Sequence, residues 1–335
     1  MTTLVTGGGG FLGSAIVRRL VDRGESVRTF SRRHYSWLDE LGVEHFQGDL
    51  TDTEAVERAC HGVETVHHTA AIAGIWGPFD RYYQVNTQGT LNVLAAARQA
   101  GCRAFVYTSS PSVTFDGSNQ EGIDESAPYP EKWLCAYPRT KALAERSVLA
   151  ADDPQGMRTC ALRPHLIWGP GDPHLIPRLI ARARQGRLRR IGRGTNLVDM
   201  VYVDNAAEAH VRAAQALLDS GAPGGKPYFL SQGEPVGCWD WINEILAAAG
   251  MEPVRRSIPL TAAYLIGAIL EAGFGLARVS AEPPMTRFLA LQLGKHHYFS
   301  IEAARRDFGY TPVVSTEEGM RRLAEWLAEE SSVST

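Results

Sequence analysis

Tyr137 and Lys141 are the residues whose types and spacing most suggest chemistry; they stand four apart in the stretch "YPRTK". On a helix this spacing puts both side chains on one face, one turn apart. A neighbouring ammonium lowers the pKa of a phenol towards neutrality, so such a tyrosine can act as a general acid or base. The chain has 4 lysines against 30 arginines, and yet a lysine stands here. The alternative is a surface helix pair without chemistry.

A glycine-rich turn, "TGGGGFLG" at residues 6–13, follows a short apolar strand and precedes a helix. Glycines let backbone amides and the positive end of a helix approach a pyrophosphate. This setting predicts a dinucleotide site, the alternative being a tight turn without a ligand. Two glycine registers fit, one beginning at Gly8 and one at Gly7. The predicted cofactor contacts are Gly7, Gly10, Phe11, Leu12 and Gly13.

The end of the second strand indicates which nicotinamide nucleotide is bound. A carboxylate about 20 residues beyond the glycines would bind a free ribose 2′-hydroxyl. Here the strand ends in "TFSRR", so Ser31 takes that place, followed by Arg32 and Arg33. Serine leaves room for a 2′-phosphate, and guanidinium groups pair with phosphate through two hydrogen bonds. We therefore expect NADP(H), with two ordinary solvated arginines as the alternative.

The third strand is followed by "GDLTD" at 48–52, where Asp49 and Leu50 are expected to contact the adenine. A helix cap is the alternative role of Asp49.

Short apolar strands alternate with helical stretches in the first half of the chain, which predicts a Rossmann-type, doubly wound parallel α/β sheet. We expect strands at 3–6, 26–30, 43–47, 64–70, 104–109 and 158–163, and helices at 11–22, about 80–100 and from Tyr137. The rhythm breaks at "GPGDP", residues 169–173. The expected domains are a dinucleotide-binding domain at 1–170, to which part of 200–231 returns, and a smaller, mostly helical substrate lobe at 171–199 and 232–330.

Composition excludes several classes of function. With 44% hydrophobic residues and a net charge of −3 over 335 residues, the chain is globular and unsuited to nucleic acid. Five scattered cysteines form no CxxC pair and the histidines have no metal-ligand spacing, so neither metal nor disulfides are predicted. A reducing cytoplasm is expected.

No membrane-targeting segment is expected from the sequence. The first residues enter strand and glycine turn directly, without a signal peptide. The apolar run "IPLTAAYLIGAIL" at 258–270 is too short to span a bilayer. It predicts a buried helix or a lid over an apolar ligand, with peripheral membrane contact as the alternative.

A series of motifs, in order along the chain, resembles the extended short-chain dehydrogenase/reductase family. The motifs are the glycine turn, "HTAA" at 68–71, "VNTQGT" at 85–90, "YTSSPSV" at 107–113, "YPRTK" and "LRPHLIWGPGD" at 162–172. That family uses the register beginning at Gly7. The segment "EPPMTRFLALQLGKHHYFSIEAARRDFGYTP" at 282–312 is similar to the 3-beta-hydroxysteroid dehydrogenase-like branch.

The resemblance implies a role for each matching residue. Ser110 would hydrogen-bond the substrate oxygen, with Ser109 as its neighbouring competitor. Tyr137 would transfer the proton, Lys141 would position cofactor and tyrosine, and Asn86 would support the site from its helix. The dinucleotide would also be lined by Tyr137, Lys141, Ala70, Ala71 and Pro164. Hydride would pass between the nicotinamide and a carbonyl carbon without a metal.

Within that branch, "AAIAGIWGPFDRYYQVN" at 70–86 is similar to bacterial ketoreductases of long-chain olefin biosynthesis. This implies NADPH-dependent reduction of the 3-keto group of a long-chain 2-alkyl-3-ketoalkanoic acid to the 3-hydroxy acid. Such a substrate needs apolar walls and a cationic or hydrogen-bonding end for its carboxylate. Candidate walls, which core packing would also explain, are Ile75, Trp76, Phe79, Tyr264, Leu265, Ile269 and Phe274. Candidates for the carboxylate are His165, Arg178 and Arg287.

Other functions stay open at this point. A 3-beta-hydroxysteroid or other hydrophobic-alcohol dehydrogenase would need a flat slot, whereas two alkyl chains need a forked or open-ended tunnel. A sugar-nucleotide epimerase is disfavoured because Ser31 replaces the usual acid. A non-catalytic NADP(H) sensor has little need for Ser110, Tyr137 and Lys141.

The resemblance also implies partners. We expect a homodimer formed through the helices near 80–100 and 137–150, and association with other olefin-biosynthesis enzymes. Chain lengths, stereochemistry and the physiological direction do not follow from the sequence.

Overall fold

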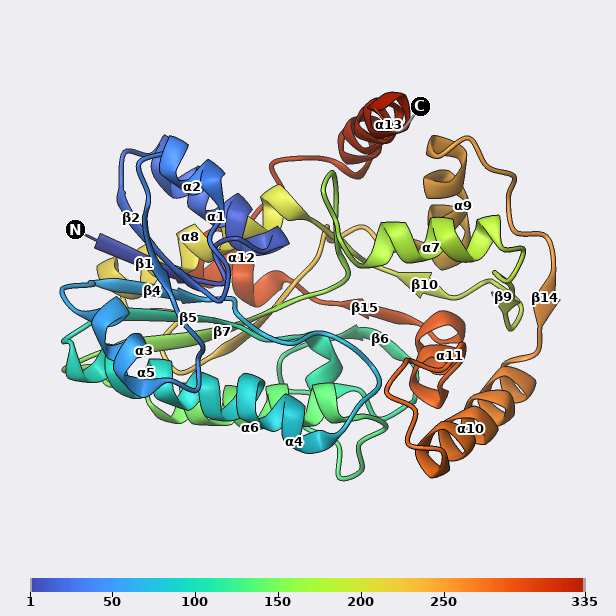
Figure 1. The fold of residues 1–335 in the computed structure, drawn as a ribbon, viewed down its shortest axis with the longest axis horizontal. Coiled ribbons are helices and arrows are strands. Elements are labelled where there is room, and N and C mark those ends of the chain that lie inside the picture. The colour runs from blue at the N-terminus through green and yellow to red at the C-terminus, as the bar shows by residue number, and fades with distance from the viewer. Residues whose placement is uncertain (1, 334–335) are drawn as a thin grey trace.

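A seven-stranded sheet organises the N-terminal part of the computed structural model, which describes residues 2–333 (Figure 1). Its strands are β1 (Thr2–Thr6), β2 (Ser26–Ser31), β3 (Glu44–Gln47), β4 (Thr65–His68), β5 (Ala104–Thr108), β7 (Arg158–Pro164) and β12 (Pro227–Leu230). They lie in the order β12-β7-β5-β4-β1-β2-β3, and all neighbours pair in parallel. The predicted doubly wound parallel sheet is therefore confirmed.

Helices cover both faces of this sheet, as the alternation of strands and helices requires. One face carries α3 (Thr53–Cys60), α5 (Gly89–Gln99) and α6 (Ala136–Ala150). The opposite face carries α1 (Phe11–Asp22), α8 (Val203–Asp219) and α12 (Glu302–Phe308), while α2 (Ser36–Glu40) packs near β3 (Figure 1). All residues of β4 and β5 are buried; β5 is largely apolar, whereas β4 also buries His67 and His68.

The helix expected near 80–100 is not uniform. It begins as α4 (Phe79–Tyr82), continues through a π-helical turn at Tyr83–Gln88, and only then becomes α5. Single π turns inside α-helices occur frequently at functional sites. Here the turn contains Asn86.

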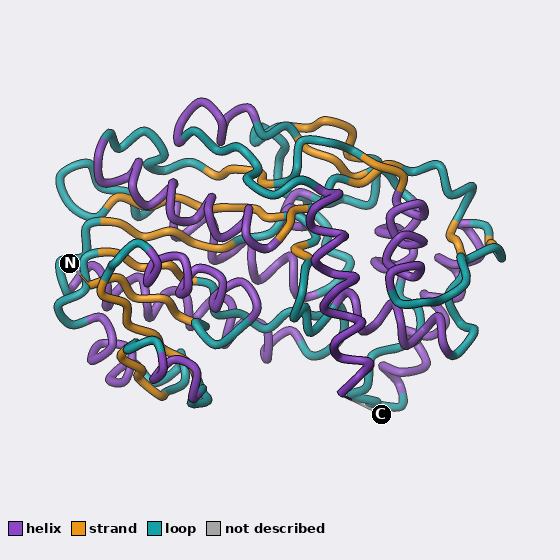
Figure 2. The backbone as a smooth tube through the Cα atoms, turned by 90° about the horizontal axis from the view of Figure 1, so that it is seen from above, coloured by secondary structure: helices purple, strands orange, loops and turns teal. Residues whose placement is uncertain are grey.

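The C-terminal part is mostly helical and lies beyond one end of the large sheet (Figure 2). Its helices are α7 (Leu175–Arg184), α9 (Cys238–Ala248), α10 (Leu260–Leu276) and α11 (Arg287–Gly294). Two small parallel sheets join β8 (Ile167–Trp168) to β11 (Val201–Tyr202) and β9 (Arg190–Ile191) to β14 (Ser257–Ile258). A core of buried side chains that includes Trp168, Trp239 and Trp241 holds this part together.

A four-stranded sheet connects segments that lie far apart in the sequence. Its order is β13-β10-β15-β6, made of β6 (Gln120–Ile123), β10 (Leu197–Val198), β13 (Val236–Gly237) and β15 (His297–Phe299). In the parallel β6–β15 pair, His297 stands opposite Gln120. The C-terminal segment is thus brought to the carboxyl end of the large sheet.

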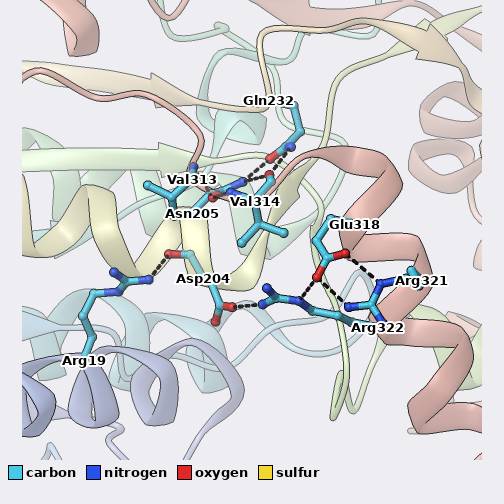
Figure 3. A network of polar contacts seen from close by, with 9 residues as sticks. All are labelled: Arg19, Asp204, Asn205, Gln232, Val313, Val314, Glu318, Arg321 and Arg322. Atoms are coloured by element: carbon cyan, nitrogen blue, oxygen red, sulfur yellow. Dashed lines mark hydrogen bonds and ion pairs between the residues drawn. The ribbon is translucent and has the colours of Figure 1, made fainter.

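A polar network fastens the last helix, α13 (Thr316–Val333), and the chain before it to α8 (Figure 3). The Asn205 side chain accepts hydrogen bonds from the amides of Val313 and Val314, at 2.8 and 2.9 Å. Arg322 of α13 pairs with Asp204 of α8 at 3.2 Å. Both contacts fix the end of the described chain against the sheet-covering helix.

Helix α10 contains the apolar run for which a buried helix or a lid was expected. The expectation of a buried helix is wrong. Only Ala263 and Gly267 are buried in it, whereas Leu265 and Ile269 are 61% and 71% exposed. The helix packs on α11 through Gly267, where a Cβ atom would lie 2.6 Å from the Thr286 carbonyl carbon. Within residues 2–333, no helix is both long and apolar enough to cross a membrane.

Candidate active site

A cavity of about 780 Å³ opens at the carboxyl ends of the strands, where the chain order reverses between β1 and β4. Ligands of doubly wound sheets bind at this switch point. The structure brings together in its lining all the residues predicted to bind cofactor: Gly7, Gly10, Phe11, Leu12, Gly13, Ser31, Arg32, Arg33, Asp49, Leu50, Ala70, Ala71, Tyr137, Lys141 and Pro164. Ser110, His165 and Arg178 line it as well.

The geometry of the glycine turn fits a pyrophosphate. Gly7 has a φ of +72°, which favours glycine, and a Cβ atom on Gly13 would clash with the Gly7 carbonyl oxygen. Helix α1 begins after Gly10 without a side-chain cap or an acidic residue in its first turn. Its first amides are therefore available to an anion. Gly8 and Gly9 face the side chains of other segments instead, which favours the register beginning at Gly7.

The end of β2 presents two arginines to the cavity. The Ser31 hydroxyl donates to the Arg33 carbonyl at 2.9 Å, and Gln47 donates to the Arg32 carbonyl at 3.0 Å, which orders this turn. In the described part of the chain, no ion pair joins Arg32 or Arg33 to a carboxylate. Both side chains line this end of the cavity, and the charge of Arg32 is among the influences that lower the pKa of Asp49.

Asp49 lines the same end of the cavity as an ionised carboxylate. Its Oδ1 accepts hydrogen bonds from the amide and hydroxyl of Thr51, at 3.0 and 2.8 Å, and the amide bond is the main cause of its lowered pKa. The helix cap at this place is Asp52, whose side chain accepts from the Ala55 amide at 3.1 Å. The alternative role of Asp49 as a cap for α3 is therefore wrong.

Tyr137 lies in the first turn of α6, beside Ser110 at the end of β5. Burial raises the pKa of Tyr137 to about 12, and a hydrogen bond with the Ser110 side chain lowers it. The Ser110 hydroxyl also lies 2.8 Å from the Ser112 hydroxyl. The Ser109 hydroxyl, the competing candidate, lines the cavity too but is buried without a partner. The geometry therefore groups Ser110, rather than Ser109, with Tyr137.

Lys141 is buried one turn behind Tyr137. Its Nζ donates to the Thr108 carbonyl at 2.5 Å and stands 4.2 Å from the centre of the Tyr107 ring. Burial lowers the pKa of Lys141 to about 7. The expectation that the lysine brings the pKa of Tyr137 towards neutrality is wrong for this arrangement, because the ammonium faces a carbonyl and burial dominates the phenol. Tyr137 is consequently protonated at neutral pH.

A buried ion pair behind Lys141 was missed in the sequence. Glu145, one further turn along α6, accepts two hydrogen bonds from Arg163 of β7, at 3.0 and 2.6 Å, and one from Tyr129 at 2.6 Å. Its charge is the influence that raises the pKa of Lys141 against burial. The position of Glu145 four residues after Lys141 is the one local signal that could have indicated it.

Asn86 does not line the cavity but fixes a loop that does. From the π-helical turn its Oδ1 accepts from the Ile72 amide at 2.7 Å, and its Nδ2 donates to the Ile72 carbonyl at 3.0 Å. The same Nδ2 reaches the Thr140 hydroxyl at 3.3 Å. Asn86 thus connects the loop after β4 to the helix that carries Tyr137.

The end of the cavity away from the glycine turn contains the candidates for substrate contact. The Nδ1 of His165 donates to the Asp199 carbonyl at 2.6 Å, and burial lowers its pKa to about 4, so the ring is neutral. Arg178 is paired with Glu282. Asp172 accepts from the Leu175 and Ile176 amides and so positions the helix that carries Arg178.

Several lining residues at this end were not identified in the sequence, because they come from distant segments. The β6–β15 pairing and α11 contribute Gln120, Phe288, Gln292, His297 and Phe299. None has a local motif, since contacts between segments far apart in the chain bring them to the cavity.

Four candidate substrate residues lie elsewhere. Trp76 and Arg287 line a separate hollow of about 520 Å³, where Arg287 is bound to Glu271 at 2.6 Å. Leu265 and Ile269 are exposed on α10 and form no wall of either cavity. The expectation that these two line the pocket is wrong, because α10 presents its small residues inward.

The remaining three aromatic candidates have packing partners. Phe79 lies under the Arg139 guanidinium at 4.5 Å, and Phe274 meets the Trp76 ring edge-on at 6.4 Å. Tyr264 packs against the core of the C-terminal part.

The parallel sheet, the glycine turn at its switch point and the Ser110, Tyr137 and Lys141 set define a nicotinamide-dependent oxidoreductase of the short-chain dehydrogenase/reductase type. The model of the 3-beta hydroxysteroid dehydrogenase/isomerase family matches residues 4–260. The chain belongs to this family.

Individual relatives extend the match over the whole chain. The 2-alkyl-3-oxoalkanoate reductase of Stenotrophomonas maltophilia (strain K279a) is 52% identical over 96% of this chain and 98% of its own. The protein with the same name in Shewanella oneidensis is 48% identical over 95% and 84%. The decarboxylating sterol-4-alpha-carboxylate 3-dehydrogenase of Mus musculus is 36% identical over 96% and 89%.

Solved structures share the architecture. The crystal structure of gox2253 has a TM-score of 0.79 at 27% identity and covers 98% of both chains. MoeE5, solved in complex with UDP-glucose and NAD, has a TM-score of 0.73 at 25% identity and covers 99% of this chain and 100% of its own.

Proposed function

We propose that this enzyme uses NADPH to reduce the 3-keto group of a long-chain 2-alkyl-3-oxoalkanoic acid to the 3-hydroxy acid. The observation that carries the proposal is the grouping of Ser110 and Tyr137, with Lys141 one turn behind, in the lining of the large cavity. The names of the 52% and 48% identical relatives supply the substrate class.

The side chains divide the chemistry among them. A bound nicotinamide nucleotide supplies the hydride for the carbonyl carbon. Tyr137, which its pKa of about 12 keeps protonated, gives a proton to the carbonyl oxygen. The Ser110 hydroxyl holds the same oxygen next to the phenol, and the Lys141 ammonium adds positive charge behind it.

Substrate assays with a Tyr137→Phe variant test this function. We expect NADPH oxidation with a long-chain 2-alkyl-3-oxoacid and a fall of kcat by about 100- to 10,000-fold in the variant, because general acid catalysis is lost. Turnover of a 3-ketosteroid but not of the oxoacid would favour the steroid branch that the family name suggests. Full activity of the variant would contradict the role of Tyr137.

We propose NADP(H) as the cofactor because Ser31 stands where a carboxylate would bind the ribose 2′-hydroxyl, and Arg32 and Arg33 line the same end of the cavity without a direct ion pair to a carboxylate within residues 2–333. Each charge-assisted hydrogen bond contributes about 1.5–3 kcal/mol. An Arg32→Ala, Arg33→Ala double variant is therefore expected to raise the KM for NADPH by at least about tenfold.

The KM for NADH and an Arg187→Ala variant are the controls, since Arg187 is an exposed arginine outside the cavity. Equal effects of the double variant on both nucleotides would contradict a 2′-phosphate site.

We further propose a division of labour between a nucleotide-binding part, residues 1–170 with part of 200–231, and a substrate lobe at 171–199 and 232–330. The inclusion of β12 in the large sheet supports the return of the chain to the first part. We also propose a homodimer through the helices of residues 79–99 and α6, and a monomer in sedimentation at micromolar concentration would contradict it.

A cytoplasmic location and association with other olefin-biosynthesis enzymes complete the proposal. All five cysteines are free, which suits a reducing compartment. Cell fractionation and co-purification with those enzymes would test both statements.

A further inference from the structure

We propose that the second hollow, beside the catalytic cavity, binds one of the two alkyl chains of the substrate; this inference rests on the proposed function. The hollow has a volume of about 520 Å³. Its walls are residues 75–77 after β4, residues 134–136 at the start of α6, Ala268, Glu271 and Ala272 on α10, and Arg287.

The position of the hollow suits a chain attached next to the reacting carbonyl. Ile75 lines both the hollow and the catalytic cavity, so the two spaces lie next to each other on either side of this residue. Ala136, another wall residue, directly precedes Tyr137 in α6. A substrate whose oxygen lies at Tyr137 could therefore extend an alkyl chain past Ile75 into the hollow.

The chemistry of the walls suits hydrocarbon rather than a carboxylate. Ile75, Trp76 and Leu134 contribute apolar side chains. The two charged wall residues neutralise each other, since Arg287 Nε lies 2.6 Å from Glu271 Oε2 and the Arg287 amide lies 2.7 Å from Oε1. Because the charge of Arg287 is already paired, this residue is a poor candidate for the substrate carboxylate.

Helix α10 is oriented to leave this space open. Ala268 and Ala272, four residues apart on one helix face, are turned to the hollow. The large apolar side chains Leu265, Ile269 and Leu276 are 61%, 71% and 87% exposed. Small residues face the hollow and large ones face solvent, which is the reverse of a helix that fills a core.

The loop opposite α10 is held in place from two sides. The Trp76 indole donates to the Val279 carbonyl at 3.2 Å, just beyond the end of α10. The Tyr82 hydroxyl donates to the Trp76 carbonyl at 2.9 Å. Gly74 has a φ of +147°, and a Cβ atom there would lie 2.7 Å from the Tyr82 hydroxyl. The outer wall of the hollow is thus built around Tyr82 and fastened to α10.

With a passage past Ile75, the two neighbouring spaces would form a fork. A fork fits a molecule with two flexible chains, whereas a rigid ring system would occupy only one branch. The hollow therefore separates the two substrate classes of the family on physical grounds.

Filling the hollow tests the inference. Ala272→Phe places a ring in it, and Ile269→Phe, on the exposed side of the same helix, is the matched control. Three oxoacids are compared by kcat/KM: one with two long chains, one with a 2-methyl branch and a long main chain, and one with a long branch and a short main chain.

We expect Ala272→Phe to lower kcat/KM at least tenfold for the substrate with two long chains and for one of the other two, leaving the third unchanged. The control should leave all three unchanged. An equal loss for all three substrates, or no loss, would overturn the inference while leaving the proposed function intact if wild-type enzyme turns them over.

A binding measurement keeps the inference testable if wild-type enzyme reduces no oxoacid, in which case the proposed function fails. A bromine-labelled long-chain fatty acid should quench the fluorescence of Trp76. The contribution of Trp76 is the difference in quenching between the wild type and Trp76→Phe. We expect Ala272→Phe to abolish that part and Ile269→Phe to retain it. Quenching unaffected by Ala272→Phe would overturn the inference.

Discussion

Removing the carboxylate of Glu145 tests the importance of the buried ion pair behind Lys141. The side chains of Glu145 and Arg163 are 0% and 2% exposed and share two hydrogen bonds. Without its partner, the guanidinium would stay buried and uncompensated, which costs about 3–5 kcal/mol. Total stabilities are about 5–15 kcal/mol, so this loss is a large share.

The assay is equilibrium unfolding in urea of four proteins: wild type, Glu145→Met, Arg163→Met and the double variant. We expect each single substitution to lower the free energy of unfolding by about 3–5 kcal/mol, because one charge is left buried. The double variant should lose clearly less than the sum, since it buries no charge. Additive losses, or a stable Glu145→Met variant, would refute this reasoning.

The same site has a kinetic signature. Burial lowers the pKa of Lys141 to about 7, and Glu145 is the influence that raises it. In Glu145→Gln the pKa of Lys141 should fall further, so Lys141 loses its proton at a lower pH than in the wild type. We expect the alkaline limb of the kcat/KM profile to move to lower pH; an unchanged profile would limit Glu145 to a structural role.

Three further predictions concern stability and the nucleotide turn. Five buried histidines have pKa values lowered to about 3 or 4 and must gain protons on unfolding: His67, His68, His165, His210 and His297. Each loses up to about 2 kcal/mol of stabilisation between pH 6.5 and 5, so the urea midpoint should fall as the pH drops through this range. Asp199, whose pKa burial raises to about 6, opposes this trend by one proton. A midpoint independent of pH would contradict their neutrality. Gly13→Ala should raise the KM for nucleotide at least tenfold because its Cβ clashes with the Gly7 carbonyl, while the control Gly273→Ala, in open space on α10, should not; equal KM values would refute the clash. Asn86→Ala leaves the Ile72 amide and carbonyl without their partner and should cost about 1–3 kcal/mol in urea unfolding, and a neutral result would show that the loop does not depend on it.

The nucleotide half of the site was predictable because its residues follow strands of one parallel sheet. Ser31 ends a strand and Gly7, Asp49 and Ala70 come just after one, and the carboxyl ends of parallel strands share an edge. Local pattern was therefore enough to place them in one cavity. Their binding roles remain predictions.

The environment of the catalytic set was not predictable. The spacing of Tyr137 and Lys141 correctly placed them on one helix, but the ammonium faces the Thr108 carbonyl, and burial raises the pKa of the phenol. Arg163, which holds Glu145 behind the lysine, comes from a neighbouring strand. Desolvation and such pairing depend on what packs around a group, and spacing along the chain carries no such information.

For the substrate half, hydrophobicity alone gave wrong positions. The apolar run that contains Leu265 and Ile269 was expected to be buried or to act as a lid, but these side chains are exposed, and the alanines beside them border the hollow. His297 reaches the catalytic cavity only because β15 pairs with β6, whose residues lie about 180 positions earlier.

The sequence by itself determined the doubly wound sheet, the glycine turn and the helix that carries Tyr137 and Lys141, because strand periodicity, glycine conformation and helical spacing act over a few residues. Only the tertiary structure decided which residues surround the substrate, which charges are paired and which face of α10 is exposed. Those properties arise from contacts between segments far apart in the chain, where burial and neighbouring charges set the energy of each side chain.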